Sequence, residues 1–250
     1  MTHQFNKYIT ELNILFNSIH ICQSHNIDHA IYVMNNAIKA MKYIHISDND
    51  KKLVSIAALL HDADDHKFFP NNLNYENLQS IMTNCNHNLN EINIVTKMVQ
   101  LVSSSKNSDC IPLDIQEWYL IPRYADRLEA IGLIGIKRCY QYNKTINAQL
   151  YDNNTPKFII KKDIIDYINN NKNRYINYNG NSATMIDHYY DKLLHLSYFP
   201  IKNTFFDEKC NILRETQLDF LLFFGLCINN NNTFTYDDVE TFISGYVEIY

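Results

Sequence analysis

The chain has 250 residues, and 46% of them are hydrophobic, which is enough for a substantial core in one large domain or two small ones. Its formal net charge is −5, and the absence of a Lys/Arg-rich run argues against a protein that holds a nucleic-acid polymer on a basic surface. A small phosphorylated ligand is compatible with this charge, because a bound metal ion can supply positive charge locally.

The N-terminus, MTHQFNKYITEL, lacks the apolar core of a secretion signal. The longest uninterrupted apolar stretch, FLLFFGLCI at 220–228, is far shorter than the ~20 residues that a membrane-spanning helix needs. Six cysteines stand apart and form no CxxC pair, so a cysteine zinc site is not expected. These features predict a soluble, intracellular (cytoplasmic) protein with no membrane partner and with free, mostly buried thiols.

Apolar residues recur at helical spacing along most of the chain. One stripe runs from Phe5 to Ile19, a second from Ala30 to Met41, and a third, SDNDKKLVSIAALL at 47–60, follows capping-type residues. A fourth stripe runs from Ile92 to Val102, and similar patterns cover about 113–140, 158–170, 183–197, 207–228 and 236–249. Alternating strand patterns are scarce, so we predict an all-α helical bundle.

Asn-rich segments interrupt the helical pattern. YNKTINAQLYDNNTPKF and NNNKNRYINYNGNS predict a peripheral insertion at about 141–182, and NNNNTFT at 229–235 predicts a loop. We therefore expect a single helical domain over residues 1–228, followed by a C-terminal extension, 229–250, that adds one helix.

Four side chains with metal-binding chemistry lie at or near helix ends. In LLHDADDHKFF (59–69), His61 and Asp62 directly follow an apolar run; His29 lies near the start of the second helix, and Asp126 lies in YADRLEAIGLIGIKR. If three helices pack around one point, two imidazoles and two carboxylates form a mixed site that suits Mn²⁺, Fe²⁺, Co²⁺ or Ni²⁺, or Mg²⁺ with low affinity. Water in an open position of such a site becomes a nucleophile near neutral pH. The alternative is that these residues only cap helices or face solvent.

Three motifs occur in a characteristic order: HNIDH at 25–29, LLHDADDHKF at 59–68 and RYADRLEAIGLIGIKR at 123–138. Together they resemble the signature of the HD-domain metal-dependent phosphohydrolases, and most closely the small HD hydrolases that include nucleotide pyrophosphohydrolases. HYYDKLLHL at 188–196, with Asn203 and Arg214 downstream, extends the resemblance over about residues 20–225. The resemblance implies an HD-domain helical bundle.

The resemblance also implies roles for individual residues. The metal ligands would be His29, His61, Asp62 and Asp126. Asp65 would accept a proton from the attacking water, and Lys67 would pair with a phosphate oxygen.

Four further positions match the family on the substrate side. His25, one helical turn before His29, would orient a ligand or touch substrate. Arg127 would bind phosphate or form a structural ion pair with Glu129 or a neighbouring helix. Lys192 and Arg214 match later positions of the family and are expected to bind substrate.

Two positions depart from the family pattern. Tyr32 stands where an Arg is common, which would weaken phosphate binding or change the choice of substrate. His66 stands where a bulky aromatic residue is common, and it is a surface residue or an additional ligand or acid.

Other residues invite a functional interpretation but have a structural one that we favour. His87 is interpreted as a loop histidine rather than a fifth ligand. Gly132 and Gly135 indicate close helix packing rather than a phosphate loop, because no strand precedes them. Tyr189 and Tyr190 indicate core packing rather than stacking on a base.

The predicted function is hydrolysis of a phosphate ester or anhydride of a small molecule by metal-bound water, with a nucleotide as the leading substrate. The alternative is a catalytically inactive HD-domain protein that binds or senses a nucleotide. The complete ligand set favours the enzyme, and Tyr32 favours the alternative. A purely helical scaffold would leave the three ordered motifs unexplained. The sequence identifies neither the metal, the base, the sugar nor the oligomeric state.

Overall fold

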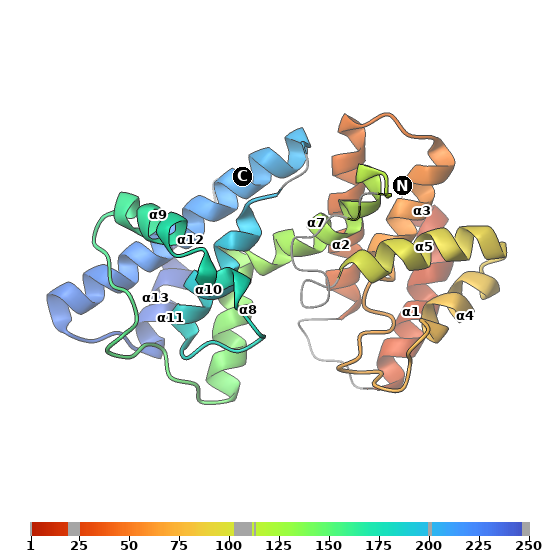
Figure 1. Ribbon diagram of the computed structural model, residues 1–250. Coiled ribbons are helices and arrows are strands. Elements are labelled where there is room, and N and C mark those ends of the chain that lie inside the picture. Colours follow the sequence, from red (N-terminus) through yellow and green to blue (C-terminus); the bar gives the residue numbers. More distant parts are fainter. Residues whose placement is uncertain (1, 20–25, 103–111, 113, 200–201, 247–250) are drawn as a thin grey trace. The chain divides into compact units, whose positions relative to one another are not determined.

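The computed structural model describes residues 2–19, 26–102, 112, 114–199 and 202–246. Every regular element in these ranges is a helix, so the all-α prediction is confirmed (Figure 1). None of the described helices is both long and apolar enough to cross a membrane. The chain forms two compact units: Met1–Asp126 with Ile201–Phe206, and Arg127–Pro200 with Asp207–Tyr250.

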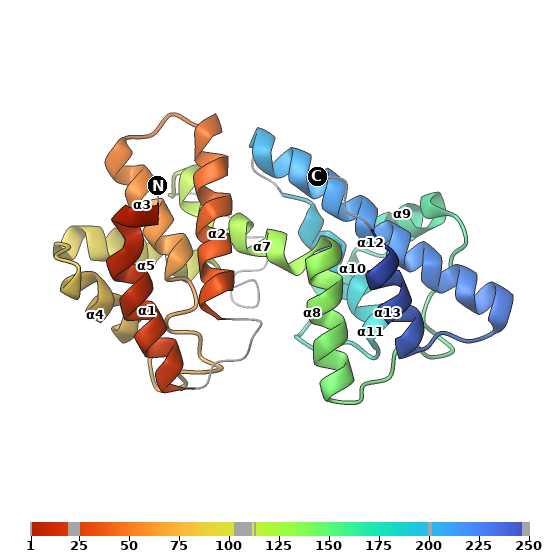
Figure 2. The ribbon, with the colours of Figure 1, turned by 180° about the vertical axis from the view of Figure 1, so that it is seen from behind.

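The first unit is a cluster of helices that carries all four predicted metal ligands. Its elements are the 3₁₀ turn Thr2–Phe5, α1 (Asn6–Ser18), α2 (Ile27–Ala40), α3 (Asp48–Leu59), α4 (Glu76–Asn84), α5 (Leu89–Val102), the 3₁₀ turn Glu117–Leu120 and α7 (Ile121–Arg127). Helix α3 packs against α2 on one side and against α5 on another (Figures 1 and 2). It is therefore the central helix of the unit.

Burial explains why α3 is central. Ser47 caps its N-terminus by accepting the N–H of Asp50, and every residue from Leu53 to Leu60 is buried. A helix that is apolar on all sides needs neighbours all round it. The chain that leaves α3 consequently emerges inside the unit, and His61 and Asp62 are its first polar residues.

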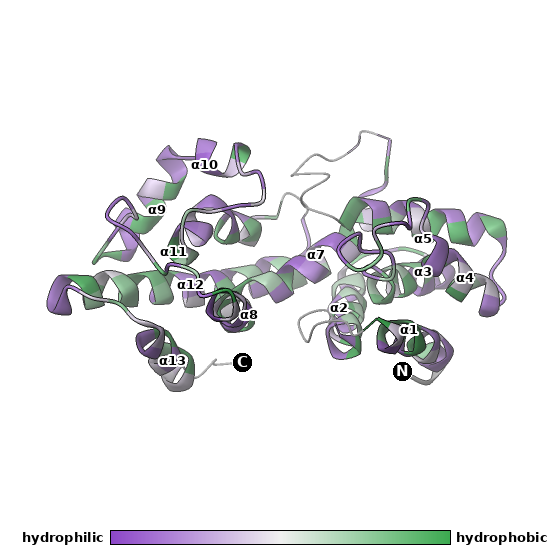
Figure 3. Ribbon diagram, turned by 90° about the horizontal axis from the view of Figure 1, so that it is seen from below, coloured by the Kyte–Doolittle hydropathy of each residue, from purple (hydrophilic) through white to green (hydrophobic). Residues whose placement is uncertain are grey.

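The second unit begins after Asp126. Its elements are α8 (Gly132–Thr145), α9 (Lys161–Asn170), α10 (Asn173–Ile176), α11 (Met185–His188), the π-helical turn Tyr189–Leu193, the 3₁₀ turn His195–Ser197, α12 (Thr204–Asn231) from Asp207 onward, and α13 (Tyr236–Gly245). Apolar residues are spread along α12, whereas its Asn-rich C-terminal end is hydrophilic (Figure 3). Phe220 and Phe223 of α12 contact Phe242 of α13, the helix predicted in the C-terminal extension.

The Asn-rich segments contain more helix than predicted. Helix α12 continues through Asn231, so the loop predicted at 229–235 begins at residue 232 in the structure. Asn232 adopts a positive φ of 55°. Asn tolerates this left-handed conformation and commonly ends helices in it. Helix α10 also lies inside a segment predicted as loop.

Side chains of the predicted insertion at 141–182 also reach the interior of the second unit. Arg174 lies 2.8 Å from Asp187 and 2.6 Å from Asp191, and Thr155 donates to Asp187 at 2.9 Å. Asp187 is buried and also accepts a hydrogen bond from the Thr184 hydroxyl at 2.7 Å, so the insertion supplies further partners to a carboxylate that needs them in the interior. That residues 1–228 form one domain, and that this insertion is peripheral, remain predictions.

The close-packing interpretation of the two glycines is confirmed. A Cβ at Gly135 would lie 2.3 Å from the carbonyl oxygen of Ala130, and one at Gly132 would lie 2.4 Å from the side chain of Leu213. Tyr189 and Tyr190 are both buried, as expected for core residues. Cys85, Cys139, Cys210 and Cys227 are free thiols, and the other two cysteines lie outside the described residues.

Candidate metal centre

His29 projects from the first turn of α2. Asn26, just before the helix, accepts the backbone N–H of His29 on its side-chain oxygen at 3.0 Å. This N-cap sets where the helix begins and therefore where the imidazole lies. Asn26 was not singled out from the sequence, although an Asn directly before a helical stripe is the expected signal.

His61 follows the end of α3. Its Nδ1 lies 2.8 Å from the carbonyl oxygen of Ala58. A carbonyl oxygen can only accept, so Nδ1 carries a proton and Nε2 of the neutral ring presents its lone pair. The hydrogen bond from Nδ1 to Ala58 fixes the orientation of the ring, as the hydrogen bond of the nitrogen that does not bind metal commonly does in histidine ligands.

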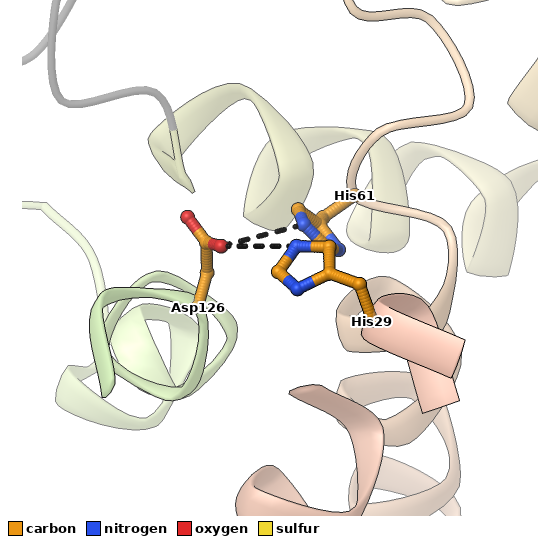
Figure 4. A group of neighbouring side chains, drawn as sticks. All are labelled: His29, His61 and Asp126. Carbon is orange, nitrogen blue, oxygen red and sulfur yellow. Dashed lines mark ion pairs between the residues drawn. The ribbon is translucent and has the colours of Figure 1, made fainter. Parts of the chain in front are cut away.

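Asp126 is supplied by α7. Three residues earlier, the fully buried Arg123 donates from Nε to the carbonyl oxygen of Leu101 at 2.6 Å, near the C-terminus of α5. That contact ties α7 to α5 and holds Asp126 over the two histidines. Figure 4 shows the three side chains of His29, His61 and Asp126 pointing toward one another.

The four donor atoms form a tight cluster. Asp126 Oδ1 lies 3.5 Å from His29 Nε2 and 3.6 Å from His61 Nε2. Asp62 Oδ2 lies 3.7 Å from His29 Nε2 and 3.3 Å from His61 Nε2. The structure thus brings together the four residues that the sequence analysis named as metal ligands, and their role as ligands remains a prediction.

The spacing of these atoms fits a shared metal ion. Donors each ~2.1 Å from one ion lie about 3.0 Å apart at a right angle and about 3.4 Å apart at a tetrahedral angle. His61 Nε2 and Asp62 Oδ2 are also buried, and within the described part of the chain neither has a hydrogen-bond partner. Buried polar atoms without partners are costly, and one cation between them would satisfy both. His29, His61 and Asp126 together meet the geometric requirement for holding a metal ion.

The electrostatics of the cluster favour a cation at its centre. Burial would lower the pKa of His61, but the charge of Asp62 and polar interactions with both carboxylates raise it well above its ordinary value. Burial would likewise raise the pKa of Asp126, yet the two histidines hold it well below its usual range. The pKa of Asp62 is lowered as well, because the attraction of His61 outweighs burial. The carboxylates are therefore ionised and attract positive charge, whether a proton or a metal ion.

The cluster is open on the Asp126 side. Side-chain exposure is 2% for His61, 6% for His29 and 13% for Asp62, but 32% for Asp126. A donor set with one exposed edge leaves positions for water or substrate, which a catalytic metal site requires.

A third carboxylate holds the loop after His61 in place. Asp64 is buried and accepts three hydrogen bonds of 2.8–3.0 Å: from the side chain of Asn72 and from the backbone N–H groups of Asn77 and Leu78. The last two lie in the first turn of α4, so Asp64 caps that helix and anchors the loop. This role has no local signal in the sequence, because Asp64 lies 13 and 14 residues before the N–H groups that it accepts.

The predicted catalytic residues follow on the same loop. Asp65 Oδ1 accepts the backbone N–H of Lys67 at 2.9 Å and lies 3.4 Å from His66 Nδ1, while its Oδ2 has no hydrogen-bond partner among the described residues. Lys67 and His66 are exposed. Asp65 and Lys67 follow Asp62 by three and five residues in the sequence, and their catalytic roles remain predictions.

The remaining predicted residues have other surroundings. His25 lies outside the described residues. Arg127 is buried, and Tyr32 is 42% exposed. Lys192 and Arg214 belong to the second unit; the Lys192 ammonium lies 5.6 Å from the ring centroid of Tyr178. Their substrate-binding roles also remain predictions.

Comparisons with known proteins place the chain in a family. No model of a known protein family matches it. It is 39% identical to the uncharacterised protein L803 of Acanthamoeba polyphaga mimivirus over a 235-residue alignment that covers 86% of this chain and 95% of the viral protein. The chain belongs to the family of L803.

Solved structures identify the fold. An HD-superfamily hydrolase from Bacillus thuringiensis superposes with a TM-score of 0.63 at 19% identity, covering 92% of this chain and 99% of that one. YpgQ of Bacillus subtilis in complex with ADP superposes with a TM-score of 0.64 at 18% identity, covering 93% of this chain and all of that one (100%). The resemblance to HD-domain proteins is thus confirmed at the level of the fold, and this relative of L803 has the HD-superfamily fold.

Proposed function

We propose that the protein is a metal-dependent phosphohydrolase that cleaves a phosphate ester or anhydride of a small molecule, with a nucleotide as the leading substrate class. The observation that carries the proposal is the convergence of His29, His61, Asp62 and Asp126, with two buried donor atoms that have no hydrogen-bond partner among the described residues. The description of one structural neighbour as a hydrolase and the ADP bound to another support the reaction class and the ligand class.

The residues that would hold the metal are His29, His61, Asp62 and Asp126. When bound, the ion would supply Lewis acidity and would lower the pKa of a water molecule that serves as nucleophile. Two imidazoles and two carboxylates suit Mn²⁺, Fe²⁺, Co²⁺ or Ni²⁺, with Mg²⁺ a weaker fit because it prefers oxygen ligands alone.

Asp65 is the proposed proton acceptor. Its Oδ1 is engaged by the backbone N–H of Lys67, which orients the carboxylate and leaves Oδ2 able to take a proton from the attacking water. The loop that carries it is anchored by Asp64, and the backbone N–H of Asp65 donates to the carbonyl oxygen of Asp62 at 3.1 Å.

Lys67 is the proposed phosphate contact. Its side chain is exposed and has no ion pair or hydrogen bond with any described residue. Three N–H donors on a flexible stem can follow a phosphate oxygen as negative charge develops in the transition state.

A panel of nucleotides and other phosphoesters, incubated with the protein and Mn²⁺, Co²⁺, Ni²⁺ or Mg²⁺, tests the proposal. We expect metal-dependent product release, and ³¹P NMR of the products identifies the bond that is cleaved. Asp62→Ala, with its metal content measured, is the negative control. Metal-loaded protein that binds nucleotides but turns over none of them would favour a nucleotide-binding protein without catalysis, which the exposed Tyr32 in place of an Arg supports.

A further inference from the structure

A pocket lies within the second unit. It has a volume of about 260 Å³ and is lined by Ser197, Tyr198, Phe199, Asp207, Cys210, Asn211 and Arg214. One wall is the end of the 3₁₀ turn His195–Ser197 and the residues after it, and the other is one face of α12, where residues 207, 211 and 214 recur at helical spacing. At ~30 Å³ per water molecule, the volume holds about nine waters, so it suits a ligand smaller than a typical drug-sized molecule.

Arg214 is held rigidly at this pocket. Its Nε donates to Ser197 Oγ at 2.8 Å, Nη2 to the carbonyl oxygen of Ser197 at 2.5 Å, and Nη1 to Asn211 Oδ1 at 3.1 Å. The guanidinium also lies 3.9 Å from the ring centroid of Tyr198. These contacts use three of the five N–H groups of an arginine, so two donors remain for a ligand. A guanidinium with a fixed orientation loses little entropy when it binds an anion.

Asp207 gives the pocket an opposite charge. It is exposed, and no described residue forms an ion pair or a hydrogen bond with it. A simple anion would be repelled by this carboxylate, whereas a ligand that also presents hydroxyl or amino groups would gain hydrogen bonds from it. Buried Cys210 adds no competing charge, since burial raises the pKa of its thiol to about 12.

We infer that this pocket binds a small hydroxylated anion, whose phosphate or carboxylate group pairs with Arg214 while its hydroxyl groups donate to Asp207. Tyr198 and Phe199 provide the less polar wall against which the carbon skeleton lies. The inference gives Arg214 a ligand of its own in place of the substrate-binding role predicted for it from the sequence, and it does not depend on the metal centre.

Calorimetric titration of the full chain in EDTA tests this inference, because EDTA removes any contribution of bound metal. The probes are ribose 5-phosphate, gluconate, inorganic phosphate and ribose. We expect a Kd between ~10 μM and ~1 mM for ribose 5-phosphate or for gluconate, and at least about tenfold weaker binding of inorganic phosphate and of ribose. The comparison of the first two probes tells whether the anionic group is a phosphate or a carboxylate.

Variants assign the binding to this pocket. Arg214→Gln should abolish binding of ribose 5-phosphate and gluconate. Asp207→Asn should weaken the binding of these two hydroxylated anions about tenfold and leave the binding of inorganic phosphate unchanged or slightly stronger. Lys161→Gln, which removes a charge that pairs with Glu215 and Asp219, and Asp163→Asn, at an exposed site on α9, are the matched controls and should bind as the wild type does.

Should Arg214→Gln fail to fold, as judged by circular dichroism, the exposed Asp207→Asn and Asn211→Ala carry the test. No binding of ribose 5-phosphate or gluconate at about 10 mM, or equal binding by the pocket variants and the controls, would overturn the inference. Either result would leave the phosphohydrolase proposal intact, because that proposal depends on metal content and turnover.

Discussion

Two histidine clusters of the first unit show what distinguishes a metal centre from a structural contact. In the first, His29 and His61 face two carboxylates at 3.3–3.7 Å, and His61 Nε2 and Asp62 Oδ2 lack hydrogen bonds within the described residues. In the second, His87 lies between Tyr8 and Glu91: its Nε2 is 2.5 Å from the Tyr8 hydroxyl, and its Nδ1 is 2.9 Å from Glu91 Oε2.

The second cluster is satisfied without a metal. Glu91 can only accept, so His87 donates from Nδ1, and its Nε2 accepts from the Tyr8 hydroxyl. Burial raises the pKa of Tyr8 to about 12, so the hydroxyl keeps its proton. His87 lies in the loop between α4 and α5 as expected, and it is not a fifth ligand; its side chain is only 3% exposed, because it links α1 to that loop. Both clusters contain histidine and carboxylate side chains. They differ because every donor in the second cluster has an acceptor, whereas the first cluster has buried polar atoms without a partner among the described residues.

Asp62→Ala should have the largest effect on the first cluster. The change removes a negative charge from the donor set, so the protein should lose its metal and, with it, all measurable phosphohydrolase activity. The loss should exceed the ~10- to 100-fold typical of residues that only orient a ligand. Elemental analysis and steady-state kinetics measure both effects. A variant that keeps metal and activity would show that the cluster is no metal centre.

Lys67→Ala separates the charges that hold metal from the charge that acts on substrate. Metal content should stay near the wild-type value, while kcat/KM falls by roughly 30- to 1,000-fold, the effect of about 2–4 kcal/mol of lost transition-state stabilisation. Asp65→Asn should also keep its metal and lose mainly kcat if it accepts the proton. Unchanged turnover in Lys67→Ala would leave the lysine as a surface residue.

His87→Gln tests the structural cluster. The variant should lose about 1–3 kcal/mol in the free energy of unfolding, because the Tyr8 hydroxyl and the Glu91 carboxylate lose a well-matched partner. Its metal content should equal that of the wild type. Urea unfolding monitored by circular dichroism gives the first quantity and elemental analysis the second. Metal loss in folded His87→Gln would mean that the two clusters are not independent.

The pH dependence of metal affinity tests whether His61 is a metal ligand. The pKa of His61 is raised well above its ordinary value, so the metal-free protein holds a proton on His61 that must leave when metal binds. Affinity should therefore fall as pH falls, by about tenfold per pH unit for each proton released, or ~1.4 kcal/mol. Competition titrations at several pH values measure the slope. His87→Gln should show the same slope, and a flat profile in the wild type would contradict the assignment.

Asn26→Ala should have the smallest effect. The variant removes the side-chain acceptor for the N–H of His29 and should cost about 0.5–2 kcal/mol of stability, with a modest fall in metal affinity because His29 is less firmly placed. Asn26→Ser, which retains a capping oxygen, should restore most of both. If Asn26→Ala and Asn26→Ser behave alike, the cap does not position the ligand.

The sequence by itself indicated most of the helices and the residues that bear the metal chemistry, but it did not indicate α4 or α10. Apolar spacing is a local property of a helix, so the stripes at Phe5–Ile19 and Ala30–Met41 could be found without tertiary information, as could the order of His29, His61, Asp62 and Asp126. Only the tertiary structure decided the rest, because hydrogen-bond matching depends on residues far apart in the chain. Asp64 caps α4 from 13 and 14 residues away, and Tyr8 meets His87 across 79. The sequence next to these residues does not reveal such partners. Contacts between distant residues likewise leave His61 facing two carboxylates, whereas they give His87 a hydrogen-bond partner for each ring nitrogen.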